Sequence, residues 1–212
     1  MEQGIDVVRQ AGRKLMRVVA RGFNTATGGK VSPNAVTLVG VVMHVPIAVF
    51  IAQGNWVFAA VLLLVFGLFD TLDGDLARLQ GRESANGMLL DSVTDRVKEV
   101  ILYGGIAYYF AVSEVNVWFA VAVATALGCS LLTSYLNAIG DAAIAKYGIK
   151  SREHVVNRAF RGGLFPFEIR MLILIIGLLS GYLTYAVVAI ALGAAYTALG
   201  RFAVVYGKLA GH

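Results

Sequence analysis

Cysteine and histidine are both scarce in this chain of 212 residues. Cys129 is the only thiol, which rules out an intrachain disulfide, and its place inside an apolar run indicates a packing role. The three histidines, His44, His154 and His212, lie far apart and form no clustered metal motif. His44 lies within an apolar run, where we expect a hydrogen-bonded structural residue.

Charged residues are also few: they make up 15% of the chain, whereas hydrophobic residues make up 58%. This balance lies outside the usual range of soluble globular domains and indicates an all-α integral membrane protein. A helix needs about 20 apolar residues to cross a hydrocarbon core of ~30 Å. Runs near that length predict about six transmembrane helices, at residues 34–53, 55–79, 86–112, 115–139, 166–186 and 187–206.

The positive charges follow one orientation of this topology. All 18 Lys and Arg residues fall in the N-terminal segment, the second, fourth or C-terminal connections, or the adjoining helix ends. Because Lys and Arg concentrate in cytoplasmic loops, both termini are predicted to face the cytoplasm. The net charge of +5 follows from this bias. No DNA- or RNA-binding motif accompanies the charge, so no nucleic-acid partner is expected.

The segment before the first span lacks the uninterrupted apolar core of a cleavable secretory signal. Its Arg9, Arg13, Arg17 and Arg21 recur every four residues and so share one side of a helix. Apolar residues, Val18 and Val19 among them, lie on the other side. The pattern predicts an amphipathic helix on the cytoplasmic membrane face, with its basic side meeting anionic headgroups. A solvated helix that obeys only the charge bias is the alternative.

The chain shows no internal repeat, low-complexity tract or evident linker. We therefore expect a single membrane domain, 1–212. It consists of the amphipathic juxtamembrane helix, 1–30, followed by the transmembrane helices, 34–206.

Acidic residues gather where the second and third predicted spans reach the cytoplasmic side. Asp70 and Asp73 are three residues apart and Asp91 and Asp95 are four apart, so each pair projects from one face of its own helix. The short loop between the two helices predicts antiparallel neighbours with their acidic ends at the same depth. Charged helix ends at the membrane interface would explain one or two of these acids, but not two facing pairs.

Four carboxylates in a partly dehydrated place repel one another unless cations neutralise them. Ligands made only of oxygen favour hard ions such as Mg²⁺, Ca²⁺ or Mn²⁺. Two such ions are a recurrent arrangement at phosphoryl-transfer centres, where they hold phosphates and stabilise developing charge. The acids therefore predict a divalent-metal site, with the positions Asp70, Asp73, Asp91 and Asp95 as its ligands.

Small residues and a cation complete the pattern Asp70-x2-Asp73-Gly74-x2-Ala77-Arg78-x8-Gly87-x3-Asp91-x3-Asp95. The small residues leave space for a ligand to approach the backbone, although small residues also serve helix packing in membranes. The run resembles the signature of the class I CDP-alcohol phosphotransferase (CDP-alcohol phosphatidyltransferase) family at every fixed position. Asp75 occupies a variable position of that signature, and we expect it at the surface.

The resemblance implies a phospholipid-synthesising transferase. Such an enzyme moves a phosphatidyl group from a CDP-linked donor, usually CDP-diacylglycerol, to an alcohol and releases CMP. It implies that two Mg²⁺ or Mn²⁺ ions are held by Asp70, Asp73 and Asp91, and that Asp95 completes the metal cluster or takes the acceptor's proton. Asp91 and Asp95 are thus the catalytic candidates. The implied CDP pocket is lined by Asp73, Gly74, Ala77, Arg78 and Gly87.

The acceptor alcohol is less defined. Arg158, Arg161 and Arg170 lie on or beside the long fourth connection and could grip a phosphate, which favours inositol phosphate or glycerol phosphate. A cytoplasmic loop is basic in any case, so serine and free inositol stay open as acceptors. An ion or proton transporter that uses the intramembrane acids is the alternative of another class. The lipid bilayer is the expected setting, and the apolar outer faces permit a homodimer.

Overall fold

The computed structural model describes residues 16–67, 69–113, 116–147, 165 and 167–210. For residues 69, 70, 144 and 208–210 it describes the backbone alone. The predicted amphipathic helix is therefore described only from residue 16, and Arg9 and Arg13 lie outside the described residues. The same holds for Arg158 and Arg161.

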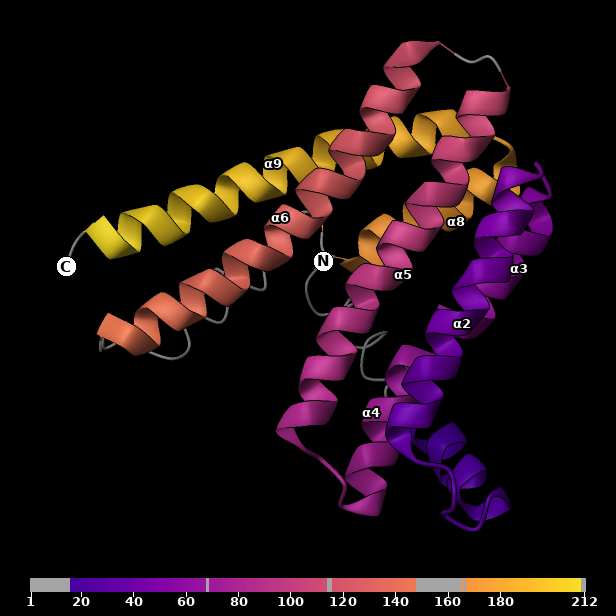
Figure 1. The fold of residues 1–212 in the computed structure, drawn as a ribbon, viewed down its shortest axis with the longest axis vertical. Coiled ribbons are helices and arrows are strands. Elements are labelled where there is room, and N and C mark those ends of the chain that lie inside the picture. Colours follow the sequence, from indigo (N-terminus) through magenta and orange to yellow (C-terminus); the bar gives the residue numbers. More distant parts are fainter. Residues whose placement is uncertain (1–15, 68, 114–115, 148–164, 166, 211–212) are drawn as a thin grey trace, which may run out of the picture.

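The described chain is helical, as the sequence predicts (Figure 1). A first helix covers residues 16–26. The helices that follow are α2 (Pro33–Ala52), α3 (Trp56–Gly67), α4 (Phe69–Gln80), α5 (Ala85–Val112), α6 (Val117–Tyr147), α8 (Phe167–Ser180) and α9 (Leu183–Ala210).

Two serine caps fix where the site-bearing helices begin. The Ser32 side chain accepts a hydrogen bond of 3.2 Å from the Ala35 amide at the start of α2, and Pro33 occupies the first turn. Ser84 accepts a bond of 3.1 Å from the Gly87 amide at the start of α5. The acidic segments of α4 and α5 are both helical, as predicted.

Four helical segments are long and apolar enough to cross a membrane by length and composition: Pro33–Ala52, Trp56–Gln80, Val117–Tyr147 and Leu183–Gly207. The chain is accordingly a multi-pass membrane protein. The helix α5 is long enough, but its N-terminal half is rich in charge, and α8 has 14 residues. The count of six spans and the orientation of the termini stay predictions.

The helix α2 packs along both α5 and α4, while α6 and α9 run side by side (Figure 1). The α2–α5 contact is very close at Gly105, where an added Cβ would lie 2.5 Å from the Ala48 carbonyl oxygen. A buried apolar cluster joins α2, α3, α5, α6, α8 and α9, with members that include Ile47, Leu63, Leu102, Ile106, Val123, Leu174 and Ile190.

His44 lies inside α2 and is buried, as expected of a structural histidine. Its Nδ1 lies 2.7 Å from the carbonyl oxygen of Gly40, one turn earlier in the same helix. The bond satisfies a polar ring atom that would otherwise be buried without a partner.

The helix 16–26 covers α4 through Met16 and Ala20, which are buried against Leu72 and Leu76. This contact fixes the orientation of α4, and with it the acidic signature on the other faces of that helix.

The remaining sides of the helix 16–26 stay open. Arg17 and Arg21 are exposed, in agreement with the predicted basic side. Val18 and Val19 are exposed as well, at 64% and 45%, so the side buried in the protein is not the predicted apolar side. The two valines are therefore available to an apolar phase outside the protein.

Candidate active site

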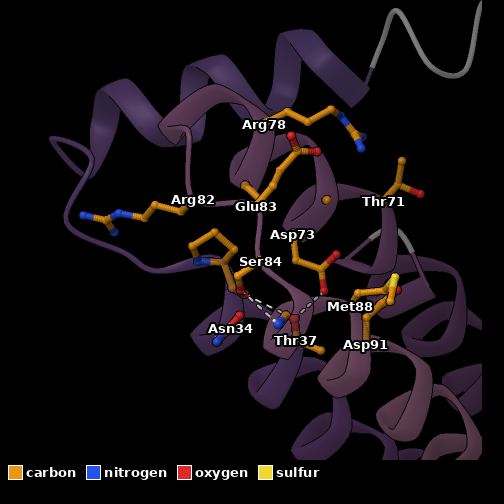
Figure 2. Close-up of a pocket in the computed structure, with 14 residues that line it drawn as sticks. Asn34, Thr37, Thr71, Asp73, Arg78, Arg82, Glu83, Ser84, Met88 and Asp91 are labelled. Carbon is orange, nitrogen blue, oxygen red and sulfur yellow. Dashed lines mark hydrogen bonds between the residues drawn. The ribbon is translucent and has the colours of Figure 1, made fainter.

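A cavity of about 430 Å³ opens where α4, α5 and the start of α2 meet (Figure 2). It gathers residues far apart in sequence, because α2 packs against both α4 and α5. Six of the eight signature residues line it: Asp73, Gly74, Ala77, Arg78, Gly87 and Asp91.

Asp73 lies in the middle of these residues and is 5% exposed. Its Oδ2 accepts a hydrogen bond of 2.5 Å from Thr37 Oγ1 on α2. In Figure 2, Arg78 lies on the opposite side of Asp73 from Thr37. Thr37 is a contact that sequence reasoning missed, and its signal was its place one turn into the helix that follows Ser32 and Pro33.

Arg78, a predicted residue of the CDP pocket, forms an ion pair with Asp75, which we expected from the sequence to lie at the surface. Its Nη2 lies 2.6 Å from Asp75 Oδ1, and the Asp75 residue is 6% exposed. The expectation that Asp75 is a surface residue was wrong. It shares a helix face with Leu72 and Leu76, and the N-terminal helix covers that face. The Arg78 side chain remains 60% exposed and borders the cavity.

Gly87 is required where α5 begins. A Cβ added there would lie 3.2 Å from Ser84 Oγ and 3.6 Å from Asn34 Oδ1. The glycine therefore lets the capped start of α5 and the start of α2 approach each other around the cavity. Asn34 and Ser84 line the same cavity.

Asp95 lies one turn beyond Asp91 on α5 but borders a different cavity. This second cavity, of about 760 Å³, lies between α5 and α6. Its polar lining includes Arg96, Ser134 and Asn137. The two predicted catalytic acids thus lie one turn apart on the same helix, and each borders a different cavity.

Two cations on α5 neighbour Asp95. Lys98 Nζ lies 3.2 Å from Asp95 Oδ1, and Arg96 Nη2 lies 3.9 Å from Asp95 Oδ2. Lys98 is 1% exposed. Sequence reasoning did not single out these cations, although a charged residue inside a predicted span is itself a signal of function.

The Glu99 carboxylate lies next to this pair and is fully buried. Its Oε1 accepts bonds from Arg96 Nη1 at 2.9 Å and from Arg170 Nη2 at 3.4 Å, and its Oε2 accepts a bond from Ser130. Arg170, one of the predicted acceptor residues, is thus at the beginning of α8 and buried inside the protein. Its Nη1 also donates to the Phe165 carbonyl oxygen at 3.0 Å.

Arg201 on α9 is a second buried guanidinium that sequence reasoning missed. Its Nη1 donates to the carbonyl oxygen of Thr133 on α6 at 3.3 Å. The Nε atoms of Arg170 and Arg201 are both buried and have no hydrogen-bond partner in the described structure. A guanidinium group with an open donor can bind an anion.

The complete predicted metal cluster stays a prediction. Asp70 lies in α4, but its side chain is not described. Among the side chains that the structure describes, no three from His, Cys, Asp and Glu gather closely enough to hold a metal ion. Asp73 and Asp91 nevertheless face one cavity, and carboxylate oxygens are the donors that hard divalent cations prefer.

Residues 30–199 match the family model described as CDP-alcohol phosphatidyltransferase. A phosphatidylinositol phosphate synthase of Corynebacterium glutamicum is 32% identical over 187 residues, which cover 84% of this chain and 79% of the relative. The enzyme of the same name from Cutibacterium acnes is 34% identical over 58% of this chain and 60% of the relative.

Solved structures show the same fold. The crystal structure of Mycobacterium tuberculosis phosphatidylinositol phosphate synthase with CDP-DAG bound is similar with a TM-score of 0.75 at 23% identity, over 91% of this chain and 94% of that one. The structure of the same protein with manganese and citrate gives a TM-score of 0.74. The family model spans most of this chain and six of the eight signature residues line one cavity, so the chain belongs to the CDP-alcohol phosphatidyltransferase family of enzymes.

Proposed function

We propose that this enzyme transfers the phosphatidyl group of CDP-diacylglycerol to a polyol phosphate, with inositol phosphate as the first candidate, and releases CMP on the cytoplasmic side. The observation that carries the proposal is the position of Asp91 and Asp95. The two acids lie one turn apart on α5 and border two different cavities. We assign the first cavity to the donor and the second, which Asp95 borders, to the hydroxyl of the acceptor.

The cavity between α2, α4 and α5 is the proposed donor site. Gly74, Ala77 and Gly87 keep side-chain bulk away from its lining, so the nucleotide can approach the helix backbone. Arg78 supplies an exposed cation for the pyrophosphate. Thr37 holds the Asp73 carboxylate, which is both a ligand candidate and part of this lining.

Asp70, Asp73, Asp91 and Asp95 are the proposed ligands of two Mg²⁺ or Mn²⁺ ions. The donor set fits such ions, since it consists of carboxylate oxygens, and at least Asp73 and Asp91 border the same cavity. When bound, the ions supply charge neutralisation to the donor's pyrophosphate. The related Mycobacterium tuberculosis enzyme has been solved in complex with manganese.

Asp95 is the proposed proton acceptor, because it faces the cavity on the α6 side rather than the donor cavity. The acceptor's hydroxyl oxygen forms a bond to the phosphorus that carries diacylglycerol. The bond from that phosphorus to the oxygen of CMP breaks, and CMP leaves. The hydroxyl proton passes to Asp95, which must lie within hydrogen-bond reach of it. Lys98 orients the Asp95 carboxylate by its contact at 3.2 Å.

The buried arginines favour an acceptor that carries a phosphate. Among the described residues, the Nε atoms of Arg170 and Arg201 have no hydrogen-bond partner, and a phosphate is an acceptor that suits such donors. Relatives named phosphatidylinositol phosphate synthase, at 32% and 34% identity, support inositol phosphate as that acceptor. Glycerol phosphate, serine and free inositol are the alternative acceptors.

Acceptor screening tests the proposal. The purified protein is supplied with CDP-diacylglycerol and Mn²⁺ or Mg²⁺, and CMP release is measured with inositol phosphate, glycerol phosphate, inositol or serine, each added alone. We expect CMP and a phospholipid product of the matching mass with inositol phosphate. Product formation only with serine or free inositol would overturn the phosphate-bearing acceptor. Metal-independent ion flux in liposomes without CMP release would support the transporter alternative instead.

A further inference from the structure

Glu99 is a fully buried carboxylate on α5 that binds donors from three helices. It accepts from Arg96 on its own helix, from Arg170 at the start of α8, and from Ser130 on α6. The Arg170 and Ser130 contacts join residues 71 and 31 positions away in the sequence. Glu99 is therefore the common anion of a polar network that connects α5, α6 and α8.

Such a network is poorly explained by stability alone. Removing a carboxylate and two guanidinium groups from water costs several kcal/mol per ion, and buried ion pairs commonly add little net stability over apolar residues of the same size. Apolar residues in place of the whole buried ion pair would serve helix packing equally well. The charge at position 99 is better explained by what it holds in place.

The two guanidinium groups that bind Glu99 also lie near one aromatic ring. The Arg96 Cζ lies 5.8 Å from the centroid of the Phe167 ring, and the Arg170 Cζ lies 5.9 Å from it. Arg96 also donates to Ser134 Oγ at 2.7 Å. Both cations are therefore fixed from two directions, by the carboxylate and by the ring.

The arrangement places one of these cations beside the proposed proton acceptor. Arg96 borders the 760 Å³ cavity together with Asp95 and Ser134, and its side chain is 29% exposed. Glu99 binds Nη atoms of both arginines. The Arg170 Nε has no hydrogen-bond partner among the residues that the structure describes.

We propose that Glu99 is a positioning residue that fixes Arg96 and Arg170 as a pair of cations for the acceptor's phosphate, which makes Arg96 a further phosphate-binding residue. The inference rests on the proposed function, since it assumes an acceptor that carries a phosphate. Glu99 touches neither substrate in this proposal. It acts by limiting where the two guanidinium groups can lie, which lowers the cost of ordering them when the acceptor arrives.

The test is steady-state kinetics of the full-length protein with CDP-diacylglycerol, Mn²⁺ and inositol phosphate. Glu99→Gln keeps the size of the side chain and removes the charge that orients both arginines. We expect the acceptor KM to rise roughly tenfold or more, because hydrogen bonds to charged groups are the stronger ones. The donor KM is expected to stay unchanged. Glu99→Asp, which restores the charge, should recover part of the loss.

Glu168→Gln is the matched control, because it is the same chemical change at a residue that is exposed on α8. It should leave all constants unchanged. An unchanged acceptor KM in folded Glu99→Gln would overturn the proposal. An equal rise in the KM of the donor and of the acceptor would also overturn it, because such a result indicates a purely structural role. If Glu99→Gln does not fold, Ser130→Ala is measured instead, since it removes a neutral donor from the same carboxylate. A selective rise in the acceptor KM would support the positioning role. An unchanged acceptor KM would overturn it.

Failure of the proposed function is distinguishable from failure of this inference. If Arg170→Ala and Arg201→Ala leave the acceptor KM unchanged, the phosphate site itself is wrong. If they raise it and Glu99→Gln does not, the phosphate site stands and only the positioning role is overturned. Arg96→Ala should raise the acceptor KM by a similar factor to Arg170→Ala, and an unchanged value would remove Arg96 from the site.

Discussion

Thr37 on α2 donates a hydrogen bond of 2.5 Å to Asp73 on α4, and it thereby connects the first span to the acidic signature. The Asp73 carboxylate is buried, so its hydrogen bonds to the protein help to set its orientation. We expect Thr37→Val to lower CMP release roughly tenfold by removing a bond to a charged group, and Thr37→Ser to preserve most activity.

Thr25→Ala is the control for Thr37, because the Thr25 hydroxyl is exposed and bonds only to a carbonyl of its own helix turn in the described structure. The assay varies the donor concentration at saturating Mn²⁺. Wild-type turnover by Thr37→Val would contradict the role given to this bond.

Asp95→Asn should abolish transfer while the protein stays folded, since an amide cannot accept the hydroxyl proton. General-base catalysis contributes about 10²–10⁴-fold, so kcat should fall within that range. CMP release is measured alongside elution from a size-exclusion column. Asp141→Asn, an exposed change on α6, should retain activity. Retained turnover in Asp95→Asn would refute the assignment of the base.

Arg170→Ala and Arg201→Ala should raise the acceptor KM by roughly tenfold or more each, because each removes a charged donor from the proposed phosphate. The donor KM should change little. The matched change Arg21→Ala lies on the exposed side of the N-terminal helix and should leave the acceptor KM unaffected. Initial rates at varied inositol phosphate give these constants.

Gly105→Ala should destabilise the protein, because the new Cβ would lie 2.5 Å from the Ala48 carbonyl oxygen in the neighbouring helix. Overpacking of this kind costs about 1–3 kcal/mol. The neighbouring Gly104 has open space where its Cβ would lie, so Gly104→Ala should be nearly neutral. Thermal unfolding in detergent compares the two, and an equal Tm would show that α2 and α5 can separate at no cost.

Local spacing was sufficient to predict the acidic helices, and the cavity between α2, α4 and α5 collects most of the signature. Residue periodicity shows which side chains share a face of one helix. It does not show which helix covers that face. The burial of Asp75 depends on the helix 16–26, which packs on α4 through Met16 and Ala20.

The polar network around Glu99 was beyond prediction for the same reason. Its members come from three helices, and their contacts span 31 and 71 positions of the sequence. The charges of Lys98, Glu99 and Arg201 inside predicted spans were a usable signal of function. Their partners could be identified only once the helices were packed.

The turn of α5 between Asp91 and Asp95 faces two separate hollows. On the proposed function, the donor and the acceptor can be bound at the same time. Turnover would then pass through a ternary complex rather than a ping-pong cycle. Added CMP would compete with CDP-diacylglycerol and would not compete with the acceptor.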